Sequence, residues 1–343
     1  MAVATSAKRK KVTFRIHRGD VVKGKFESRV EEFEVKYNDS TTILQALEGI
    51  KAEQDGSLTF RRSCGASICG SCGMVVNNRS RLACKTRIHD ILDGDEDKGR
   101  RAQSIIEIKP QNSQPVLKDL AVDISQFYQT VHNIKPYVQD GDESEKNVDK
   151  TSFEQVNMVS NCIMCGCCYS DCTEMVANPD FLGPAALAKA FRFVSDPREG
   201  KVTERLKQLS EENGIWDCTR CGMCMDACPK GVAPMEAIGK LRTRAIAAGV
   251  VNNRGAKHAK VFKDDIENFG VLNEFTMMIK TAGILGSIGQ LGNAFHLAKK
   301  GKVPPPLPHK VEGLSEVSAI YKALEEDPID VETKQLDTGP GAG

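Results

Sequence analysis

The sequence lacks any hydrophobic stretch long enough to cross a membrane. Its longest uncharged run, residues 281–298, contains Gln290, Asn293, His296 and four glycines. A membrane-spanning helix needs about 20 consecutive, predominantly apolar residues. We therefore expect that, if the protein works at a membrane, another chain supplies the span.

An excess of charge of one sign and an export signal are also missing. Lys and Arg total 47 against 46 Asp and Glu, so the formal net charge is only +1. This balance argues against nucleic acid as a partner, because a polyanion is bound by clustered positive charge. Residues 1–11 are polar and basic, without the apolar core of a signal peptide or a twin-arginine pair. The sequence thus predicts no export.

Cysteine, in contrast, is abundant, with 13 residues in the chain. A protein that stays in a reducing compartment neither forms nor keeps structural disulfides. Metal ligation is therefore the better explanation for so many thiols.

Four cysteines follow the C-x4-C-x2-C spacing, with a fourth cysteine further along, that is typical of plant-type 2Fe-2S clusters. They are Cys64, Cys69, Cys72 and Cys84. Zinc is the weaker alternative, because structural zinc sites prefer two separated C-x2-C pairs. We expect Gly65, Gly70 and Gly73 to permit a tight, partly left-handed loop whose backbone amides point at the cluster.

Eight more cysteines form two runs with the bacterial-ferredoxin spacing C-x2-C-x2-C-x3-C. The runs are Cys162, Cys165, Cys168, Cys172 and Cys218, Cys221, Cys224, Cys228. In such pairs the fourth cysteine of each run binds the cluster of the other run. We therefore expect Cys228 to join Cys162, Cys165 and Cys168, and Cys172 to join Cys218 and Cys224. Cys167 is left over, and we interpret it as a small buried hydrophobe.

The first part of the chain predicts a small α+β domain that ends near residue 115. Residues 12–17 and 30–37 alternate apolar and polar side chains as half-buried strands do. Asp39 and Ser40 are then candidate N-caps for a short helix through Leu47. We expect further strands at residues 73–76 and 104–108, the latter being the last.

The rest of the chain predicts mainly helices. A polar, acidic run at residues 139–152 indicates a loop, so residues 116–152 form an interdomain segment. Residues 184–194 and 235–247 show helical spacing, which predicts an all-α domain over residues 153–250. The extension, residues 251–343, contains an amphipathic segment at 317–324 and a Gly-rich end expected to be disordered.

Glycines recur at every third position from Gly283 to Gly292 within this extension. One interpretation is a loosely helical segment packed on its own domain, since glycine lowers helix propensity. The alternative is a face of small residues that approaches a partner subunit or the bilayer surface closely.

These residues resemble the iron-sulfur subunit of succinate dehydrogenases and fumarate reductases over residues 12–245. The segments that carry the resemblance are residues 62–72 and 82–84 around the first cysteines, 115–123, 127–128 and 134–137 between the two cysteine regions, and 183–187, 192–193, 196, 228–232 and 234 around the later ones. A simple ferredoxin would not need several of these segments. They therefore indicate this family more specifically than the cysteine spacing alone does.

The resemblance implies a β-grasp, plant-type ferredoxin domain followed by an all-α, bacterial-type two-cluster ferredoxin domain and a C-terminal extension. The first domain would face an FAD-containing flavoprotein subunit, and the third cluster would lie near a membrane anchor or a cysteine-rich quinone-reactive subunit. The chain would pass single electrons as part of succinate dehydrogenase or fumarate reductase and carry no acid-base catalyst of its own. The expected location is peripheral, on the cytoplasmic side of the cell membrane.

Two departures from the family pattern stand out. The third cluster is usually 3Fe-4S, with a non-cysteine residue where this chain has Cys221, so the additional thiol favours 4Fe-4S. The alternative is a 3Fe-4S cluster with Cys221 as an idle thiol beside it. The family usually has proline and then tryptophan after the residue matching Cys172, whereas Thr173, Glu174 and Met175 follow here. Thr219 likewise replaces a common histidine.

The second departure makes the chain more similar to variants whose partner is a cysteine-rich subunit of the heterodisulfide-reductase kind. Two alternative functions therefore stay open. One is the iron-sulfur subunit of a thiol-linked fumarate reductase or a glycolate-oxidase-type complex. The other is a stand-alone polyferredoxin carrier.

Overall fold

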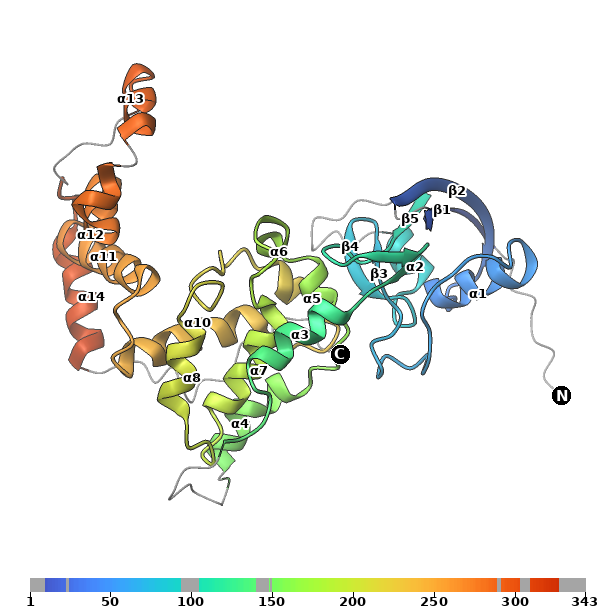
Figure 1. Ribbon diagram of the computed structural model, residues 1–343, viewed down its shortest axis with the longest axis horizontal. Helices are drawn as coiled ribbons and strands as arrows, with labels where there is room; N and C mark the ends of the chain where they lie inside the picture. The colour runs from blue at the N-terminus through green and yellow to red at the C-terminus, as the bar shows by residue number, and fades with distance from the viewer. Residues whose placement is uncertain are drawn as a thin grey trace. The chain divides into compact units, whose positions relative to one another are not determined.

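The computed structural model describes residues 10–22, 25–93, 105–139, 148, 150–288, 291–302 and 309–326. These residues fall into two compact units (Figure 1). The first unit takes the described parts of residues 1–200 together with 218–238, and the second takes 201–217 and 239–326. The domain boundaries expected near residues 115, 152 and 250 stay predictions.

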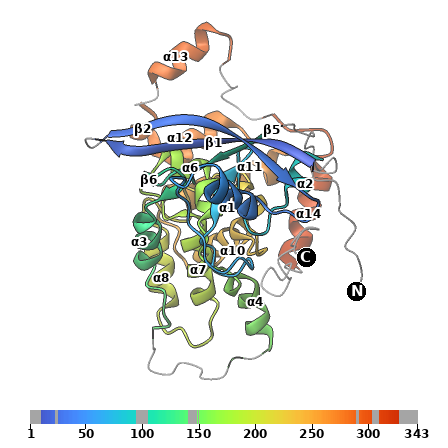
Figure 2. The ribbon, with the colours of Figure 1, turned by 90° about the vertical axis from the view of Figure 1, so that its right-hand side faces the viewer.

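The first unit begins with a sheet built on two long antiparallel strands. β1 (Lys10–Val22) and β2 (Lys25–Tyr37) pair along their whole length, and Figure 2 shows the long ribbon that they form. β1 also pairs in parallel with β5 (Ile105–Lys109). β3 (Gly73–Val76) joins β5 to β4 (Arg79–Leu82). The predicted strands are thus confirmed, although β1 and β2 extend beyond the expected bounds.

The sheet does not end at β5, so the expectation that residues 104–108 form the last strand was wrong. β6 (Val116–Lys118) pairs with β1 through Lys118 and Asp20, and β7 (Ala121–Val122) pairs with β6. Strands of three and two residues are too short to show an alternating pattern. Residues expected to lie between domains therefore add to the sheet.

The helix after β2 begins later than predicted. α1 (Ile43–Glu53) has Thr42 as its N-cap, not Asp39 or Ser40. The Thr42 hydroxyl accepts a hydrogen bond from the Gln45 N–H at 3.2 Å, and the Gln45 side chain accepts one from the Thr42 N–H at 2.9 Å. This reciprocal capping box satisfies two N–H groups that the helix leaves unpaired.

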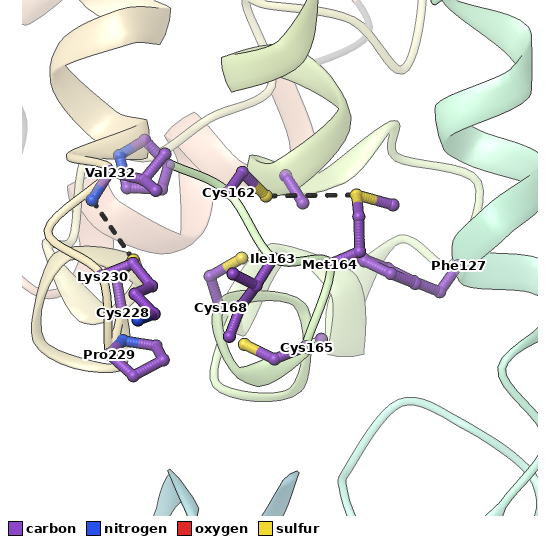
Figure 3. A pocket seen from close by; sticks show the side chains of 13 residues that line it. Phe127, Cys162, Ile163, Met164, Cys165, Cys168, Cys228, Pro229, Lys230 and Val232 are labelled. Atoms are coloured by element: carbon purple, nitrogen blue, oxygen red, sulfur yellow. Dashed lines mark hydrogen bonds between the residues drawn. The ribbon is translucent and has the colours of Figure 1, made fainter. Parts of the chain in front are cut away.

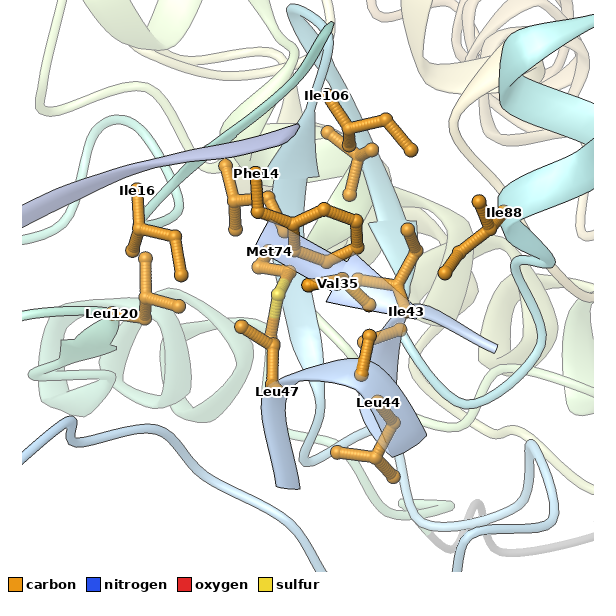
Figure 4. Close-up of a cluster of buried hydrophobic side chains, with 14 of the residues drawn as sticks. Phe14, Ile16, Val35, Ile43, Leu44, Leu47, Met74, Ile88, Ile106 and Leu120 are labelled. Atoms are coloured by element: carbon orange, nitrogen blue, oxygen red, sulfur yellow. The ribbon is translucent and has the colours of Figure 1, made fainter. Parts of the chain in front are cut away.

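The core of the sheet domain lies between the sheet and α1. Figure 4 shows Phe14 from β1, Leu47 from α1 and Met74 from β3 directed toward one another. All three side chains are buried. Burial of a side chain of this size stabilises the fold by about 2 kcal/mol, so the core holds the loop between α1 and β3 in place.

Short helices and one long helix complete the first unit. Their bounds are α2 (Ile88–Leu92), α3 (Ser125–Asn133), α4 (Lys150–Ser160), α5 (Cys167–Ser170), α6 (Thr173–Ala177), α7 (Gly183–Val194) and α9 (Met223–Asp226). α7 confirms the helix predicted at residues 184–194 and packs against α3, α4 and α5. α5 also packs against β4, so the helices lie directly on the sheet domain.

The second unit is helical. It contains α8 (Val202–Leu209), α11 (Arg254–Phe269), α12 (Glu274–Ile288), α13 (Leu291–Lys299) and α14 (Leu314–Glu326), and α10 (Pro234–Ala247) runs from the first unit into it. α10 confirms the helix predicted at residues 235–247, and the amphipathic segment expected at residues 317–324 lies within α14. α11 packs against α12 and α14, and the buried Asp265 carboxylate accepts a 3.1 Å hydrogen bond from the Thr276 hydroxyl.

Several expectations concern segments that the structure describes only in part. α12 is helical but broken at Gly283, whose φ of 74° is left-handed, as the loosely helical interpretation predicted. Most of the predicted loop at residues 139–152 and the Gly-rich end lie outside the described residues, and α4 already begins at Lys150. Among the helices of the described ranges, none has the length and apolarity that crossing a membrane requires.

A buried ion pair fastens the turn between β6 and β7 to β1. Arg18 and Asp119 are 1% and 2% exposed, and the Arg18 Nε lies 3.2 Å from the Asp119 Oδ1. The Arg18 guanidinium also donates to Glu31 at 2.8 Å and to Asp55. The Asp119 carboxylate accepts from the Thr59 N–H at 2.8 Å, at the start of the first cysteine loop.

Replacing Arg18 should therefore destabilise the protein strongly. Arg18→Met leaves the Asp119 carboxylate buried without its cation, which costs about 3–5 kcal/mol in the free energy of unfolding. The matched control is Lys10→Met, which removes the Lys10–Asp39 pair and should change the free energy of unfolding far less, because both side chains are exposed to solvent. Denaturant unfolding of both variants measures the difference, and equal losses would contradict the assigned role of Arg18.

Candidate metal centres

The first cysteine group, Cys64, Cys69, Cys72 and Cys84, lies at one end of the sheet domain. Three of its members come from the loop between α1 and β3, and Cys84 follows β4. Backbone N–H groups of this loop point at the thiols. Ala66, Ile68 and Cys69 donate to the Cys64 Sγ at 3.3, 3.4 and 3.3 Å. Ser67 donates to the Cys84 Sγ at 3.3 Å, so the loop curls around the sulfur atoms.

Left-handed residues produce this curl, as the sequence predicted in part. Gly65 and Gly70 have φ values of 63° and 75°, and Ser67 adopts 58°. Gly73, by contrast, is not among the residues with positive φ, so the loop is left-handed at only some of its glycines, as expected. Its lack of a side chain instead lets the backbone of another loop come close.

The two sides of the first group differ in their electrostatics. Burial raises the pKa of the Cys72 thiol to about 12. On the exposed side, hydrogen bonds from the Ser71 hydroxyl and from the N–H groups of Cys64 and Ser71 lower the pKa of Cys69 to about 6. Donors that point at sulfur favour the thiolate, which is the form that binds a metal.

The second cysteine group, Cys162, Cys165, Cys168 and Cys228, surrounds a cavity in the helical part of the first unit. Figure 3 shows these four side chains around the same space, three from one loop and Cys228 from another. Phe127 and Val232 also line the cavity. Burial raises the pKa of Cys168 well above its usual value, and the neighbouring thiols Cys165, Cys162 and Cys228 raise it further.

The third cysteine group, Cys172, Cys218, Cys221 and Cys224, lines a separate cavity together with Phe181, Pro184 and Met235. Burial raises the pKa of Cys224 to about 12, and the three neighbouring thiols act in the same direction. Burial also acts to raise the pKa of Cys221. Hydrogen bonds from the Met223 N–H and the hydroxyls of Thr173 and Thr219 outweigh it, so that this pKa is lowered.

The two cysteine runs repeat the same backbone conformation. Met164 and Gly166, on either side of Cys165, are left-handed with φ values of 57° and 75°. Arg220 and Gly222 flank Cys221 in the same way, with 57° and 81°. A four-residue helix lies within each run, α5 directly after Gly166 and α9 directly after Gly222. Cys221 therefore occupies the position in its run that Cys165 occupies in the other.

These short helices explain how the fourth cysteine of each run reaches the cavity lined by the other run. α5 leads from the second group to Cys172, which lines the cavity of the third group. α9 leads from the third group to Cys228, which lines the cavity of the second. The grouping in space agrees with the predicted exchange, whereas ligation itself stays a prediction. Cys167 is fully buried, as predicted, and packs in the core of the sheet domain.

The arrangement of donors fits iron-sulfur clusters. All 13 cysteines are free thiols. Each of the second and third groups encloses a mostly apolar cavity, where several thiolates repel one another unless positive charge is bound among them. In the described part of the chain, no three His, Cys, Asp or Glu side chains are arranged to hold a single metal ion. The thiols of the second group and those of the third group each line one cavity, where they could together hold a cluster.

Sequence reasoning missed one residue at these sites. Gln111 is 4% exposed and lies between the loops of the first and second groups, where its Nε2 donates to the Cys165 carbonyl at 2.9 Å. A single buried glutamine outside a regular element has no periodicity or motif that would predict its position.

Two family models match the chain. A 2Fe-2S iron-sulfur cluster binding domain matches residues 13–129, and a 4Fe-4S dicluster domain matches residues 158–232. The first match contains the whole first cysteine group, and the second contains the other two. The α+β fold expected from the sequence, with an N-terminal sheet domain, is consistent with these matches.

Curated relatives share both regions. The chain is 38% identical over 210 residues to the fumarate reductase iron-sulfur subunit of Escherichia coli O6:H1, a match that covers 60% of this chain and 82% of the relative. It is 31% identical over 273 residues to the 8-methylmenaquinol:fumarate reductase iron-sulfur subunit of Wolinella succinogenes, a match that covers 78% of this chain and 83% of the relative. It is 32% identical to the succinate dehydrogenase iron-sulfur subunit of Coxiella burnetii, a match that covers 63% of this chain and 88% of the relative.

A solved structure supports the same fold. A chain of the Mycobacterium smegmatis Sdh1 complex in the apo form aligns with a TM-score of 0.59 at 21% identity, over 70% of this chain and 97% of that chain. With relatives above 30% identity over most of their length, this protein belongs to the family of electron-transferring iron-sulfur subunits of fumarate reductases and succinate dehydrogenases.

Proposed function

We propose that this chain relays single electrons between an FAD-containing flavoprotein subunit and a membrane anchor or quinone-reactive subunit. The proposed ligands are Cys64, Cys69, Cys72 and Cys84 for a 2Fe-2S cluster, Cys162, Cys165, Cys168 and Cys228 for a 4Fe-4S cluster, and Cys172, Cys218, Cys221 and Cys224 for a third cluster. When bound, iron-sulfur clusters accept and release single electrons. The residues of this chain bind the clusters, bury them and donate hydrogen bonds to sulfur.

The exchange of the fourth cysteines is the observation that carries this proposal. Cys228 lines the cavity of the second group, with Cys162, Cys165 and Cys168. Cys172 lines the cavity of the third group, with Cys218, Cys221 and Cys224. The same exchange occurs in two-cluster ferredoxins. The exchange supports an all-α, bacterial-type domain over residues 153–250. Before it we propose a β-grasp, plant-type ferredoxin domain that adds β6 and β7 to the expected residues 1–115, and after it an extension over residues 251–343.

For the third cluster we propose the 4Fe-4S type. Cys221 lies in the same local backbone as Cys165, with a left-handed residue on each side. It lines the same cavity as Cys172, Cys218 and Cys224. A 3Fe-4S cluster would leave this thiol without a metal, although its position repeats that of a proposed ligand.

The exposure of the two outer groups supports an order for the relay. Cys64 and Cys69 are exposed, and Ile68 beside them is 62% exposed, which suits a docking flavoprotein. At the third group Cys221 is exposed and Val176 on α6 is 71% exposed, which suits a second partner. The second group has no exposed cysteine and would lie between the two in the relay. We place the chain peripherally on the cytoplasmic side of the membrane.

One feature favours a second candidate, a thiol-linked fumarate reductase or glycolate-oxidase-type complex. The Thr173 hydroxyl lies 3.7 Å from the Cys221 Sγ, where the family pattern has proline. The surface beside this four-cysteine site is polar and exposed. Such a surface suits contact with a cysteine-rich partner better than it suits quinone binding, which needs an apolar pocket.

Turnover by the native complex tests the proposed function. The complex purified from membranes should reduce a quinone analogue or a dye with succinate, or reduce fumarate with a quinol. Turnover only with a thiol as the reductant would select the second candidate. A preparation rich in flavin and iron that is inactive with both dicarboxylates would contradict a succinate or fumarate partner.

Replacing Cys221 should change the third cluster alone. In Cys221→Ala we expect one iron to be lost and an oxidised three-iron EPR signal to appear, because three cysteines remain at that site. The control Cys167→Ala removes a buried thiol that hydrogen-bonds Cys165 in the second group and should leave the signal of the third cluster unchanged. A full-occupancy three-iron signal in the undamaged, unmutated protein would contradict the 4Fe-4S assignment.

The exchange predicts which cluster each fourth cysteine serves. Cys228→Ala should remove the signal of the cluster held by Cys162, Cys165 and Cys168, while Cys172→Ala should affect the third cluster. Redox titrations followed by EPR distinguish the two clusters by their potentials. The exchange is wrong if Cys228→Ala and Cys224→Ala affect the same signal.

A further inference from the structure

The loops of the first and second cysteine groups touch through glycine. A Cβ atom added at Gly70 would lie 2.8 Å from the Cys165 Cα, and one added at Gly73 would lie 3.0 Å from the Cys165 carbonyl oxygen. Real Cβ atoms essentially never come within 3.0 Å of a neighbouring atom. The backbones of the two loops thus approach as closely as they do because side chains are absent at Gly70 and Gly73.

Gln111 ties the loops together at this contact. Its Nε2 donates to the Cys165 carbonyl at 2.9 Å, and its Oε1 accepts from the Gln114 Nε2 at 2.9 Å. A Cβ at Gly73 would fall 2.4 Å from the Gln111 Nε2, and one at Gly166 would fall 3.0 Å from its Oε1. The carboxamide therefore fills a slot between two glycines, one from each side of the contact.

Further hydrogen bonds hold the same two regions together. The Ser80 N–H, on β4, donates to the Asp171 carboxylate at 3.0 Å, and the Ser80 hydroxyl donates to Ser170 at 2.7 Å. The Asn112 N–H donates to the same Ser170 hydroxyl at 2.8 Å. Cys167 from α5 is packed in the sheet core. These contacts hold α5 on the sheet domain, whereas the loop before α5, which carries Cys165, is held against Gly70 and Gly73 by Gln111.

We propose that Gln111, seated against Gly73 and Gly166, is a positioning residue that sets the separation between the first and second clusters and thereby the speed of electron passage between them. This inference rests on the proposed function, because it assumes clusters on the first and second cysteine groups. The rate of electron tunnelling falls steeply with distance, so a contact without side chains between the two loops keeps passage fast. Gln111 binds no cluster and exchanges no proton in this role.

A side chain added at Gly73 should push the two cysteine loops apart and slow electron passage without removing a cluster. Gly73 does not have a positive φ, so alanine and valine are compatible with its backbone, and their side chains would push against Gln111 and Cys165. In Gly73→Ala and then Gly73→Val we expect a progressive loss of the magnetic interaction between the two reduced clusters in EPR. Electron passage after a rapid reductive pulse should slow severalfold, with both cluster potentials little changed.

Two further variants complete the test. Gly49→Ala, on α1, is the matched control, because a Cβ there meets no atom within 4 Å, and it should behave as the unmutated protein does. Gln111→Leu removes the hydrogen bond to the Cys165 carbonyl without adding a side chain between the loops, and it should also weaken the magnetic interaction. This variant decides the outcome if the Gly73 variants fail to assemble.

The proposal is overturned if Gln111→Leu, or a Gly73 variant that assembles, keeps both clusters together with the unmutated magnetic interaction and rate. Absence of the two cluster signals from the unmutated protein would instead contradict the proposed function. The two failures are therefore distinguishable in the same set of spectra.

Discussion

The structure depends on the crowding of thiols in mostly apolar cavities. Each of the second and third cysteine groups brings four sulfur atoms around one mostly apolar space, and burial raises the pKa of Cys168 and Cys224. Such a set is poorly stable as free thiolates, because burial and mutual repulsion both oppose their charge. Bound iron supplies the missing positive charge, so metal binding and folding are expected to be coupled in these regions.

The surrounding fold keeps these groups in place by different means. Left-handed residues and short helices shape the two cysteine runs, with Gly166 and Gly222 at the start of α5 and α9. The buried Arg18–Asp119 pair holds the turn after β6 against β1, and Asp119 also accepts from the Thr59 backbone at the start of the first cysteine loop. Gln111 then joins that loop to the second cysteine group. The sheet domain and the cluster-bearing helices thus form one continuous packing arrangement.

The sequence predicted those features that follow from local spacing. Cysteines three residues apart can meet at one site whatever the rest of the chain does, so the grouping of the first three thiols of each run was foreseeable. The exchange of Cys172 and Cys228 is not local and was foreseeable only from the doubled ferredoxin spacing. The regular helices α7 and α10 were foreseeable from periodicity. The short strands β6 and β7 and the seat of Gln111 were not, because each depends on contacts with residues far away in the sequence. The N-cap Thr42 was missed although the local capping box with Gln45 could have predicted it.

The most direct test of the central claim, that three cysteine groups hold three clusters, is the iron and acid-labile sulfide content of the anaerobically purified complex, measured together with its Mössbauer and EPR spectra. The account predicts one 2Fe-2S cluster and two cubane 4Fe-4S clusters for each chain. Zinc in place of iron, or a protein with only one type of cluster at full occupancy, would contradict it.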